Sequence, residues 1–132
     1  MLAYRIEHSE TNSGPYSDPH EVWDIIYAHD DMAHPSPDED TEEVFKFYRS
    51  NEICSCALAT KELVYEWFAD FIELLVENSY VLRTFEVPEG SYAIGAQIVF
   101  IRDDAECINS EELDPTLDPM YELNKLREKN VR

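Results

Sequence analysis

Residues 53–102 hold most of the apolar side chains of this 132-residue chain, and they constrain its fold more than any other stretch. Their pattern predicts a short strand at Ile53–Thr60, one long amphipathic helix at Lys61–Asn78 and a β-hairpin at Ser79–Arg102. In the helix, apolar residues recur three and four positions apart and form one wide face. Such a face must be covered by a sheet or by several helices, so we expect an α+β fold.

The hairpin is predicted from its turn. Val87–Gly90 has Pro at its second position and ends on a Gly, which accepts a positive φ. The second strand, Tyr92–Arg102, is largely apolar on both faces, which places it centrally in a sheet. Arg83 and Gln97 are the polar exceptions on these strands, and we interpret them first as satisfied core or rim residues.

Shorter elements flank this region. We expect a strand at Leu2–Glu7, a helix from Pro19 to about His29, a second short helix after Thr41, a polar surface strap at Asp103–Pro119, and a last helix at Pro119–Lys129 capped by Asp118. The predicted fold is therefore a small mixed or antiparallel sheet packed against one long amphipathic helix, with short peripheral helices. Residues 1–109 would form the domain, and residues 110–132 the strap and C-terminal helix.

The net charge of −19 is the strongest compositional signal. Twelve acidic residues and no Lys or Arg lie between Arg5 and Lys46, and four of the ten basic residues lie in the last eight positions. Direct binding to nucleic acid requires a basic surface, and an anionic membrane would repel this chain. A basic protein would be attracted to it.

Three cysteines and the lack of an apolar run long enough to cross a bilayer favour a cytoplasmic protein without disulfides. Cys54 and Cys56 fall on one face of their strand and are expected to be small core residues. A nucleophilic Cys–His pair stays open as an alternative, although nothing in the spacing brings a cysteine and a histidine together.

The first functional hypothesis is an acidic binding protein that occupies the basic surface of a partner, as an inhibitor or nucleic-acid mimic would. The partner would be a basic protein, such as a nucleic-acid-binding or defence enzyme, and the chain itself would be a monomer or homodimer. The hypothesis involves no catalysis and no cofactor. Seven clustered acids are the predicted partner-binding residues: Asp30, Asp31, Asp38, Glu39, Asp40, Glu42 and Glu43. The competing interpretation is a charged surface that only maintains solubility.

The segment His29–Asp38 offers a second, weaker possibility. It contains two histidines, His29 and His34, together with three carboxylates, and such groups can coordinate a divalent metal. Their spacing matches no established metal motif, so a solvated acidic loop is the favoured interpretation.

Several short runs resemble small uncharacterised proteins of phages and prophages. The resemblance rests on Tyr4–Glu7, Gly14–Tyr16, His34–Pro37 and Leu63–Phe68, and it covers about the first hundred residues. It implies a phage or mobile-element origin, with the host cytoplasm as the expected location.

The order of elements is also loosely similar to small ADP-ribosyltransferase-like domains. That resemblance implies an NAD-holding residue on the first strand, a hydroxyl residue before a helix and an acid on a late strand. The matching positions are Arg5, Thr60 and Gln97. Gln97 departs from the pattern because a neutral amide does not stabilise positive charge as a carboxylate does, and no Ser-Thr-Ser run is present. The resemblance therefore implies either an enzyme or an inactive relative that binds NAD.

Overall fold

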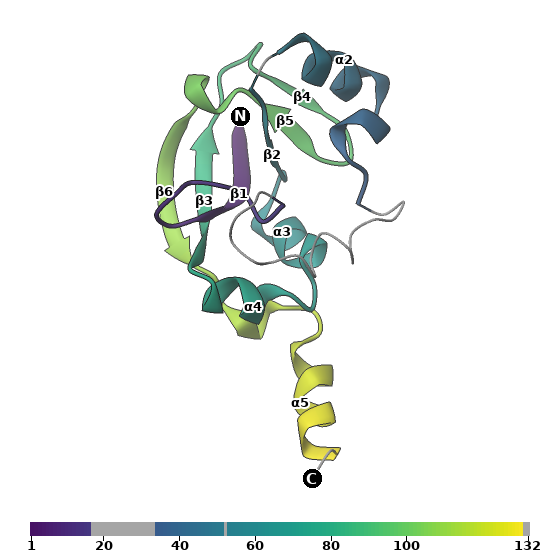
Figure 1. Ribbon diagram of the computed structural model, residues 1–132, viewed down its shortest axis with the longest axis vertical. Coiled ribbons are helices and arrows are strands. Elements are labelled where there is room, and N and C mark those ends of the chain that lie inside the picture. Colours follow the sequence, from purple (N-terminus) through teal and green to yellow (C-terminus); the bar gives the residue numbers. More distant parts are fainter. Residues whose placement is uncertain (17–33, 52, 131–132) are drawn as a thin grey trace.

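In the residues that the computed structural model describes (1–16, 34–51 and 53–130), six strands form two antiparallel three-stranded sheets (Figure 1). The first sheet has the order β1-β3-β6, with strands Leu2–His8, Tyr80–Glu86 and Glu106–Glu112. The second has the order β2-β5-β4, with strands Ser55–Ala57, Ile98–Phe100 and Tyr92–Ile94.

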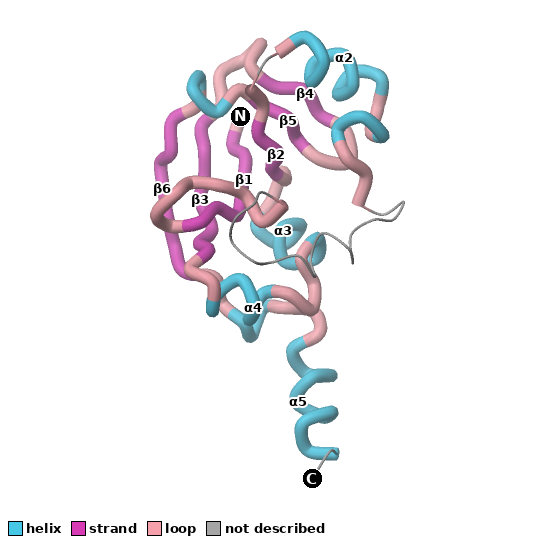
Figure 2. Tube along the Cα trace, in the orientation of Figure 1, coloured by secondary structure: helices cyan, strands magenta, loops and turns pink. Residues whose placement is uncertain are grey.

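β1 and β2 are neighbours, and this places the two sheets side by side (Figure 2). An antiparallel bridge between Tyr4 and Leu58 joins them through two backbone hydrogen bonds of 2.9 Å. Across both sheets the strands therefore follow the order β6-β3-β1-β2-β5-β4. Among the described residues, this bridge is the only backbone pairing between β1 and the β2 region.

Short helices cover the sheets. In the described parts of the chain, the α-helices are α2 (Glu42–Ser50), α3 (Lys61–Trp67), α4 (Ile72–Glu77) and α5 (Tyr121–Asn130), and the 3-10 turns are η1 (Pro37–Glu39), η2 (Arg102–Asp104) and η3 (Pro115–Leu117). α2 lies beside the second sheet, and α5 extends away from the rest of the molecule (Figure 1). Thr41 caps α2 and Thr60 caps α3, each accepting a hydrogen bond from a backbone N–H three residues later.

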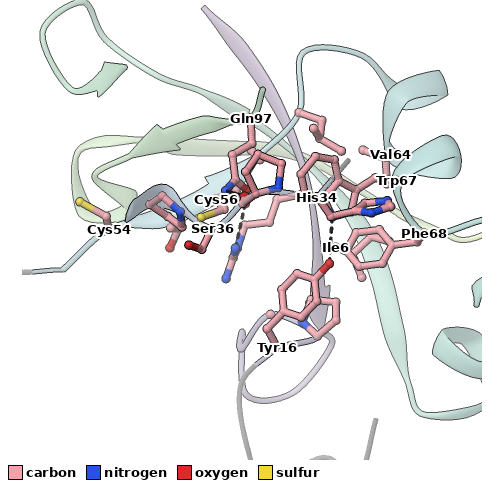
Figure 3. A pocket seen from close by; sticks show the side chains of 18 of the residues that line it. Ile6, Tyr16, His34, Ser36, Cys54, Cys56, Val64, Trp67, Phe68 and Gln97 are labelled. Carbon is pink, nitrogen blue, oxygen red and sulfur yellow. Dashed lines mark hydrogen bonds between the residues drawn. The ribbon is translucent and has the colours of Figure 1, made fainter. Parts of the chain in front are cut away.

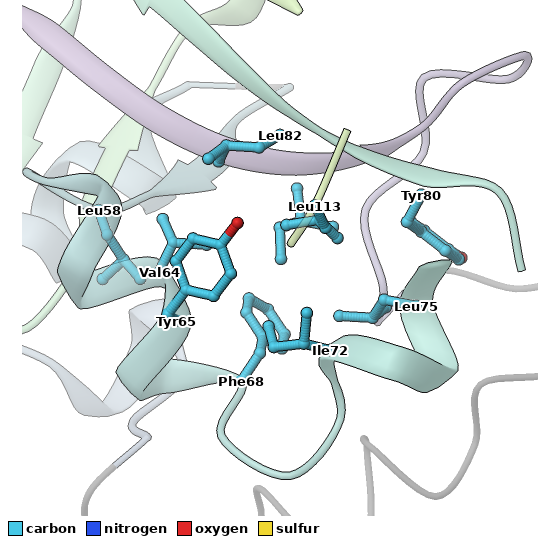
Figure 4. Close-up of a cluster of buried hydrophobic side chains, with 10 residues drawn as sticks. Leu58, Val64, Tyr65, Phe68, Ile72, Leu75, Tyr80, Leu82 and Leu113 are labelled. Atoms are coloured by element: carbon cyan, nitrogen blue, oxygen red, sulfur yellow. The ribbon is translucent and has the colours of Figure 1, made fainter. Parts of the chain in front are cut away.

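Three apolar clusters hold these layers together. The largest lies between the first sheet and the helices α3 and α4, and Figure 4 shows its side chains converging. A second, which includes Ala3, Phe85 and Phe100, lies between the two sheets. A third joins Val44 of α2 to Ala93 and Val99 of the second sheet. The expected α+β fold is confirmed.

The predicted long helix at Lys61–Asn78 is wrong, because α3 and α4 are separate helices. The chain turns at Asp70, whose φ is +75°. The N–H groups of Asp70 and Ile72 donate to the carboxylate of Asp118 instead of to helix carbonyls, at distances from 2.9 to 3.4 Å. Apolar periodicity continues through the break, so the sequence pattern alone did not reveal it.

The predicted β-hairpin is also wrong, although a turn forms one residue later than expected, at residues 88–91. Ser91 N–H donates to the carbonyl of Pro88, and Gly90 has a φ of +90°. The strands on either side of this turn belong to different sheets, and the stretch predicted as one strand folds back on itself as β4 and β5. The carboxylate of Asp40 holds the turn between them by accepting from the N–H groups of Ala96 and Gln97.

The predicted polar strap proves to contain strand β6, an edge strand paired with β3. Its backbone makes the pairing while its side chains stay mostly exposed, so the polar sequence concealed it. The expected domain boundary at residue 109 falls inside this strand.

The predictions for the first strand, for the helix after Thr41 and for the last helix are confirmed in slightly shifted form. The carboxylate of Asp118 accepts from Met120 N–H at 2.8 Å, but α5 begins only at Tyr121, so Asp118 lies ahead of the helix and not at its N-cap. The helix predicted between Pro19 and His29 lies outside the described residues. Among the described residues, no helix has the length and apolar character needed to span a membrane.

Candidate functional site

A pocket of about 600 Å³ lies where β1 and β2 separate (Figure 3). β1 contributes Tyr4, Arg5 and Ile6 to its lining. The strand β2 and residues 54–58 around it line the facing side. The rest of the described lining comes from residues 14–16 and 34–37, from α3 with Phe68, and from Glu39, Tyr48 and Gln97. Small-molecule sites typically enclose about 300–1,000 Å³, so the volume suits a small ligand.

One wall of the pocket is aromatic. Trp67 of α3 donates its indole N–H to the hydroxyl of Tyr16 at 2.8 Å. The ring of His34 stands edge-on to Trp67 with 4.8 Å between ring centroids, and the rings of Tyr16 and Phe68 lie 5.9 Å apart. These contacts fix how the rings of this wall are oriented.

The opposite part of the lining is polar, and its main cationic group is the guanidinium of Arg5. Arg5 Nε donates to Glu7 at 2.7 Å, and Nη1 donates to the carbonyl oxygen of Cys56 at 2.8 Å. Neither bond uses Nη2, which has no hydrogen-bond acceptor among the described residues. A guanidinium fixed on one side with donors left on the other suits an anionic ligand group.

Gln97 lies in the turn just before β5 and is only 8% exposed. Its side-chain amide donates to the carbonyl oxygen of Pro35 at 3.0 Å, while Asp40 accepts from its backbone N–H. A Cβ atom at Gly95 would collide with the Asp40 carboxylate, so glycine allows this close approach. The segment 35–40 therefore determines how Gln97 is presented to the pocket.

The backbone of β1 contributes as well. Tyr4 directs its N–H and C=O toward β2, as the bridge to Leu58 shows. Because hydrogen-bonding direction alternates along a strand, the N–H and C=O of Ile6 point to the same side of β1 as those of Tyr4. Ile6 lines the pocket. Among the described residues outside β3, no backbone group pairs with the N–H or C=O of Ile6, so this strand edge offers one donor and one acceptor.

The thiols in the lining are poor nucleophiles. Burial raises the pKa of Cys56 to about 11, and burial also raises the pKa of Cys54. Both thiols are therefore overwhelmingly protonated near neutral pH, whereas nucleophilic cysteines act as thiolates. This weighs against the Cys–His alternative even though His34 lines the same pocket.

Behind Arg5 lies a buried ion cluster centred on Glu7, whose side chain is fully buried. Its carboxylate accepts from Arg5, from Arg83 at 3.0 Å, and from Arg102 through two bonds of 2.8 and 3.0 Å. Burial alone would raise the pKa of Glu7, but the hydrogen bonds from these arginines outweigh burial and lower that pKa. Glu7 is therefore ionised at neutral pH. We call Glu7, Arg5, Arg83 and Arg102 the Glu7 cluster.

The structure separates the three residues that the transferase resemblance selects. Arg5 and Gln97 both line the pocket, from β1 and from the turn before β5. Thr60 is the exposed N-cap of α3 and is not among the described lining residues. The serines in the described lining are Ser36 and Ser55, of which Ser55 lies on β2. The carboxylate in the described lining belongs to Glu39 in η1.

The predicted partner-binding acids divide into three groups. Asp30 and Asp31 lie outside the described residues. Exposed carboxylates belong to Asp38, Glu39, Glu42 and Glu43, of which Asp38 pairs with Arg49 and Glu42 with Lys46, each at 3.0 Å. Asp40 points inward, and its carboxylate accepts hydrogen bonds from backbone N–H groups of the β4–β5 turn.

The weak metal hypothesis is not supported in the described part of the chain, where no three His, Cys, Asp or Glu side chains gather as metal ligands would. His29, one of the two histidines it used, lies outside the described residues.

Sequence analysis missed Glu7, Trp67 and Ser55 as site residues. Arg5 and Glu7 are two positions apart and lie on the same face of their strand. Charged side chains on a strand inside a sheet need partners, and this pattern could have indicated a buried ion pair. Trp67 looked like an ordinary residue of the apolar helix face. The position of Ser55 depends on where β2 leaves β1, which no local pattern encodes.

Comparison with known proteins identifies the family. No curated protein matches the chain, and no solved structure does either. The family model of the bacteriophage T4 Y00F protein matches residues 1–114, which include all six strands and the pocket. This confirms the phage resemblance seen in the sequence. The chain belongs to the bacteriophage T4 Y00F protein family.

Proposed function

We propose that the pocket between β1 and β2 binds NAD or a closely related dinucleotide, and that the protein does so without transferring ADP-ribose. The observation that carries this proposal is the convergence of Arg5, Ser55 and Gln97 on one pocket, from β1, from β2 and from the turn before β5. Of these three residues, the loose transferase similarity selects Arg5 and Gln97, whereas it selects Thr60 and not Ser55 as the hydroxyl residue.

The groups in the pocket fit the parts of a dinucleotide. Arg5 supplies a guanidinium for the pyrophosphate, and the Trp67 wall supplies a surface for an aromatic base. The strand edge at Ile6 supplies a donor and an acceptor, and a primary carboxamide, such as that of nicotinamide, carries the complementary pair.

The same residues argue against transfer. Bound NAD supplies a nicotinamide–ribose bond whose cleavage leaves positive charge on the ribose. Gln97 is neutral, and its amide N–H is committed to Pro35, so it offers no carboxylate to that charge. The carboxylate of Glu39 belongs to η1 and is exposed, and this weakens its electrostatic effect. We therefore propose binding as the function, with the ligand acting as an effector or a sequestered molecule.

Titration with NAD by isothermal calorimetry tests this proposal. Wild-type protein should bind NAD, and Arg5→Gln should weaken binding at least tenfold. Arg49→Gln is the matched control, because it removes the same charge from an exposed arginine. A failure of the wild-type protein to bind NAD, or equal weakening by both substitutions, would overturn the proposal.

We propose a second candidate function, in which the acidic surface engages a basic partner protein. It is favoured by the net charge of −19 and by four exposed carboxylates within residues 38–43. Charge on this scale steers oppositely charged partners and makes their binding sensitive to salt. The two functions are compatible, since a basic protein could be the target that ligand binding regulates.

A pull-down from host lysate at low salt, eluted with a salt gradient, tests the second function. Substitution of Asp38, Glu42 and Glu43 by lysine should abolish capture of a basic protein. Retention that ignores both the salt and these substitutions would contradict it.

A further inference from the structure

The Glu7 cluster contains more positive than negative charge. Three guanidiniums surround one carboxylate, which leaves a formal charge of +2 in a chain whose net charge is −19. Arg5 and Arg83 are direct partners across β1 and β3, an arrangement that is unfavourable for like charges. Their side chains are only 14% and 13% exposed, so water screens this repulsion poorly.

Arg83 and Arg102 hold the cluster in place through several bonds each. Arg83 donates to Glu7, to the side-chain oxygen of Asn12 and to the carbonyl oxygen of Ser9. Arg102 makes two hydrogen bonds to Glu7, and its guanidinium lies 5.2 Å from the centre of the Phe85 ring. Neither Arg83 nor Arg102 is among the described residues that line the pocket.

Arg5 is the member of the cluster that reaches the pocket. Glu7 and the Cys56 carbonyl hold two sides of its guanidinium and leave Nη2 without an acceptor among the described residues. A Cβ atom at Gly14 would lie 2.9 Å from this Nη2. The glycine leaves room for the Arg5 guanidinium. The bonds of that guanidinium to Glu7 and Cys56 prevent it from moving away from residue 14.

We propose that Glu7, Arg83 and Arg102 are positioning residues that hold Arg5 toward the pocket with an excess of positive charge, so that the pocket selects ligands bearing phosphate groups over neutral ones. The proposal deepens the proposed function and rests on it for the identity of the pocket. A pyrophosphate carries the charge that the cluster lacks. Neutral fragments of the same ligand gain nothing from the cluster.

A purely structural role for the cluster makes a different prediction. A cluster that only joins β1, β3 and η2 would affect all ligands equally when it is weakened, through the fold. A cluster that acts through Arg5 would affect anionic ligands alone. Arg102→Gln separates the two roles, because it removes one positive charge and both hydrogen bonds to Glu7 without removing a residue from the described lining.

The experiment measures the affinities of the full-length protein for NAD, inorganic pyrophosphate and nicotinamide by calorimetry or NMR titration. Arg102→Gln should weaken the binding of NAD and of pyrophosphate by roughly tenfold, since one charge is lost at short range. The affinity for nicotinamide should stay unchanged. Arg127→Gln is the matched control, because it removes the same charge from an exposed position on α5 and should change none of the three. Gly14→Ala provides a second variant, expected to displace Arg5 and show the same selectivity, in case Arg102→Gln does not fold.

The outcomes distinguish this inference from the function on which it rests. NAD binding that is indifferent to Arg102 and Gly14 would overturn the inference and leave the proposed function standing. Equal losses for nicotinamide and NAD would also overturn it, in favour of the structural role. Pyrophosphate binding that depends on Arg102, in a protein that does not bind NAD, would support the anion selectivity and contradict the proposed dinucleotide function.

Discussion

The acids of residues 38–43 and the single acid Glu7 show how differently the same kind of side chain is used in this molecule. The acids at 38–43 are mostly exposed, and two of them pair singly with Arg49 and Lys46 on the surface. Glu7 is fully buried and forms ion pairs with three arginines. Density of acids along the sequence thus identifies a charged surface, whereas burial and the number of partners identify the carboxylate on which the site depends.

Replacement of Glu7 should produce the largest effect. Glu7→Gln removes the charge that holds three arginines, and the loss of one partner from a buried ion cluster typically costs about 3–5 kcal/mol. Glu42→Gln removes a surface partner of Lys46 and should cost less than about 1 kcal/mol. Urea denaturation measures both free energies of unfolding. If both substitutions lowered the free energy of unfolding equally, the proposed difference between buried Glu7 and the exposed acids of residues 38–43 would be wrong.

Asp40 sharpens the comparison, because it belongs to the acidic segment by sequence and to the site by structure. Asp40→Ala should lower the free energy of unfolding by about 1–3 kcal/mol, since it leaves the N–H groups of Thr41, Ala96 and Gln97 without their acceptor. NAD affinity should fall as well, because Gln97 loses its anchor. If Asp40→Ala behaved like Glu42→Gln in both measurements, the proposed role of segment 35–40 in the site would be wrong.

The pH dependence of stability distinguishes the regions in another way. The pKa of folded Glu7 lies below its usual value of 4.5. Its contribution to stability is therefore complete above that value and is lost as the pH falls through the lower, folded-state pKa. Glu7→Gln should lack this part of the acid-induced loss, while Glu42→Gln should retain it. The check is thermal unfolding between pH 7 and pH 2, and parallel curves for wild type and Glu7→Gln would contradict it.

The smallest effect is expected at the surface pair of Asp38 and Arg49. Asp38→Asn should change the free energy of unfolding by less than about 1 kcal/mol, because exposed pairs gain little and are screened by salt. Repeating the denaturation in high salt should reduce even this difference. A large, salt-independent loss would mean that Asp38 does structural work that its exposed ion pair does not reveal.

The sequence predicted the parts of the fold that local patterns encode. The alternation in β1 and the caps at Thr41 and Thr60 formed as expected, and the turn that contains Gly90 formed one residue later than predicted. The long helix failed because Asp118, forty-eight residues from Asp70, competes for its backbone N–H groups. The hairpin failed because Asp40 stabilises a turn within the predicted strand. Both errors arise from a distant carboxylate that local periodicity cannot include.

The site was predictable only in fragments. Arg5 and Gln97 were selected through a family resemblance, and both line the pocket, whereas Thr60 does not. Ser55 and Trp67 reach the pocket because β2 separates from β1 and α3 follows at once, which is a property of topology. The Glu7 cluster combines β1, β3 and η2, so no single stretch of sequence contains its signal.

A crystal structure of the protein grown with NAD is the most direct test of the central claim, that the functional site is the pocket beside the Glu7 cluster. The account predicts electron density between Arg5 and Trp67, with the pyrophosphate against the guanidinium and a ring against the aromatic wall. The Glu7 cluster should keep its hydrogen bonds in that complex. Density for NAD elsewhere on the molecule, or none in the pocket at saturating concentration, would contradict the account.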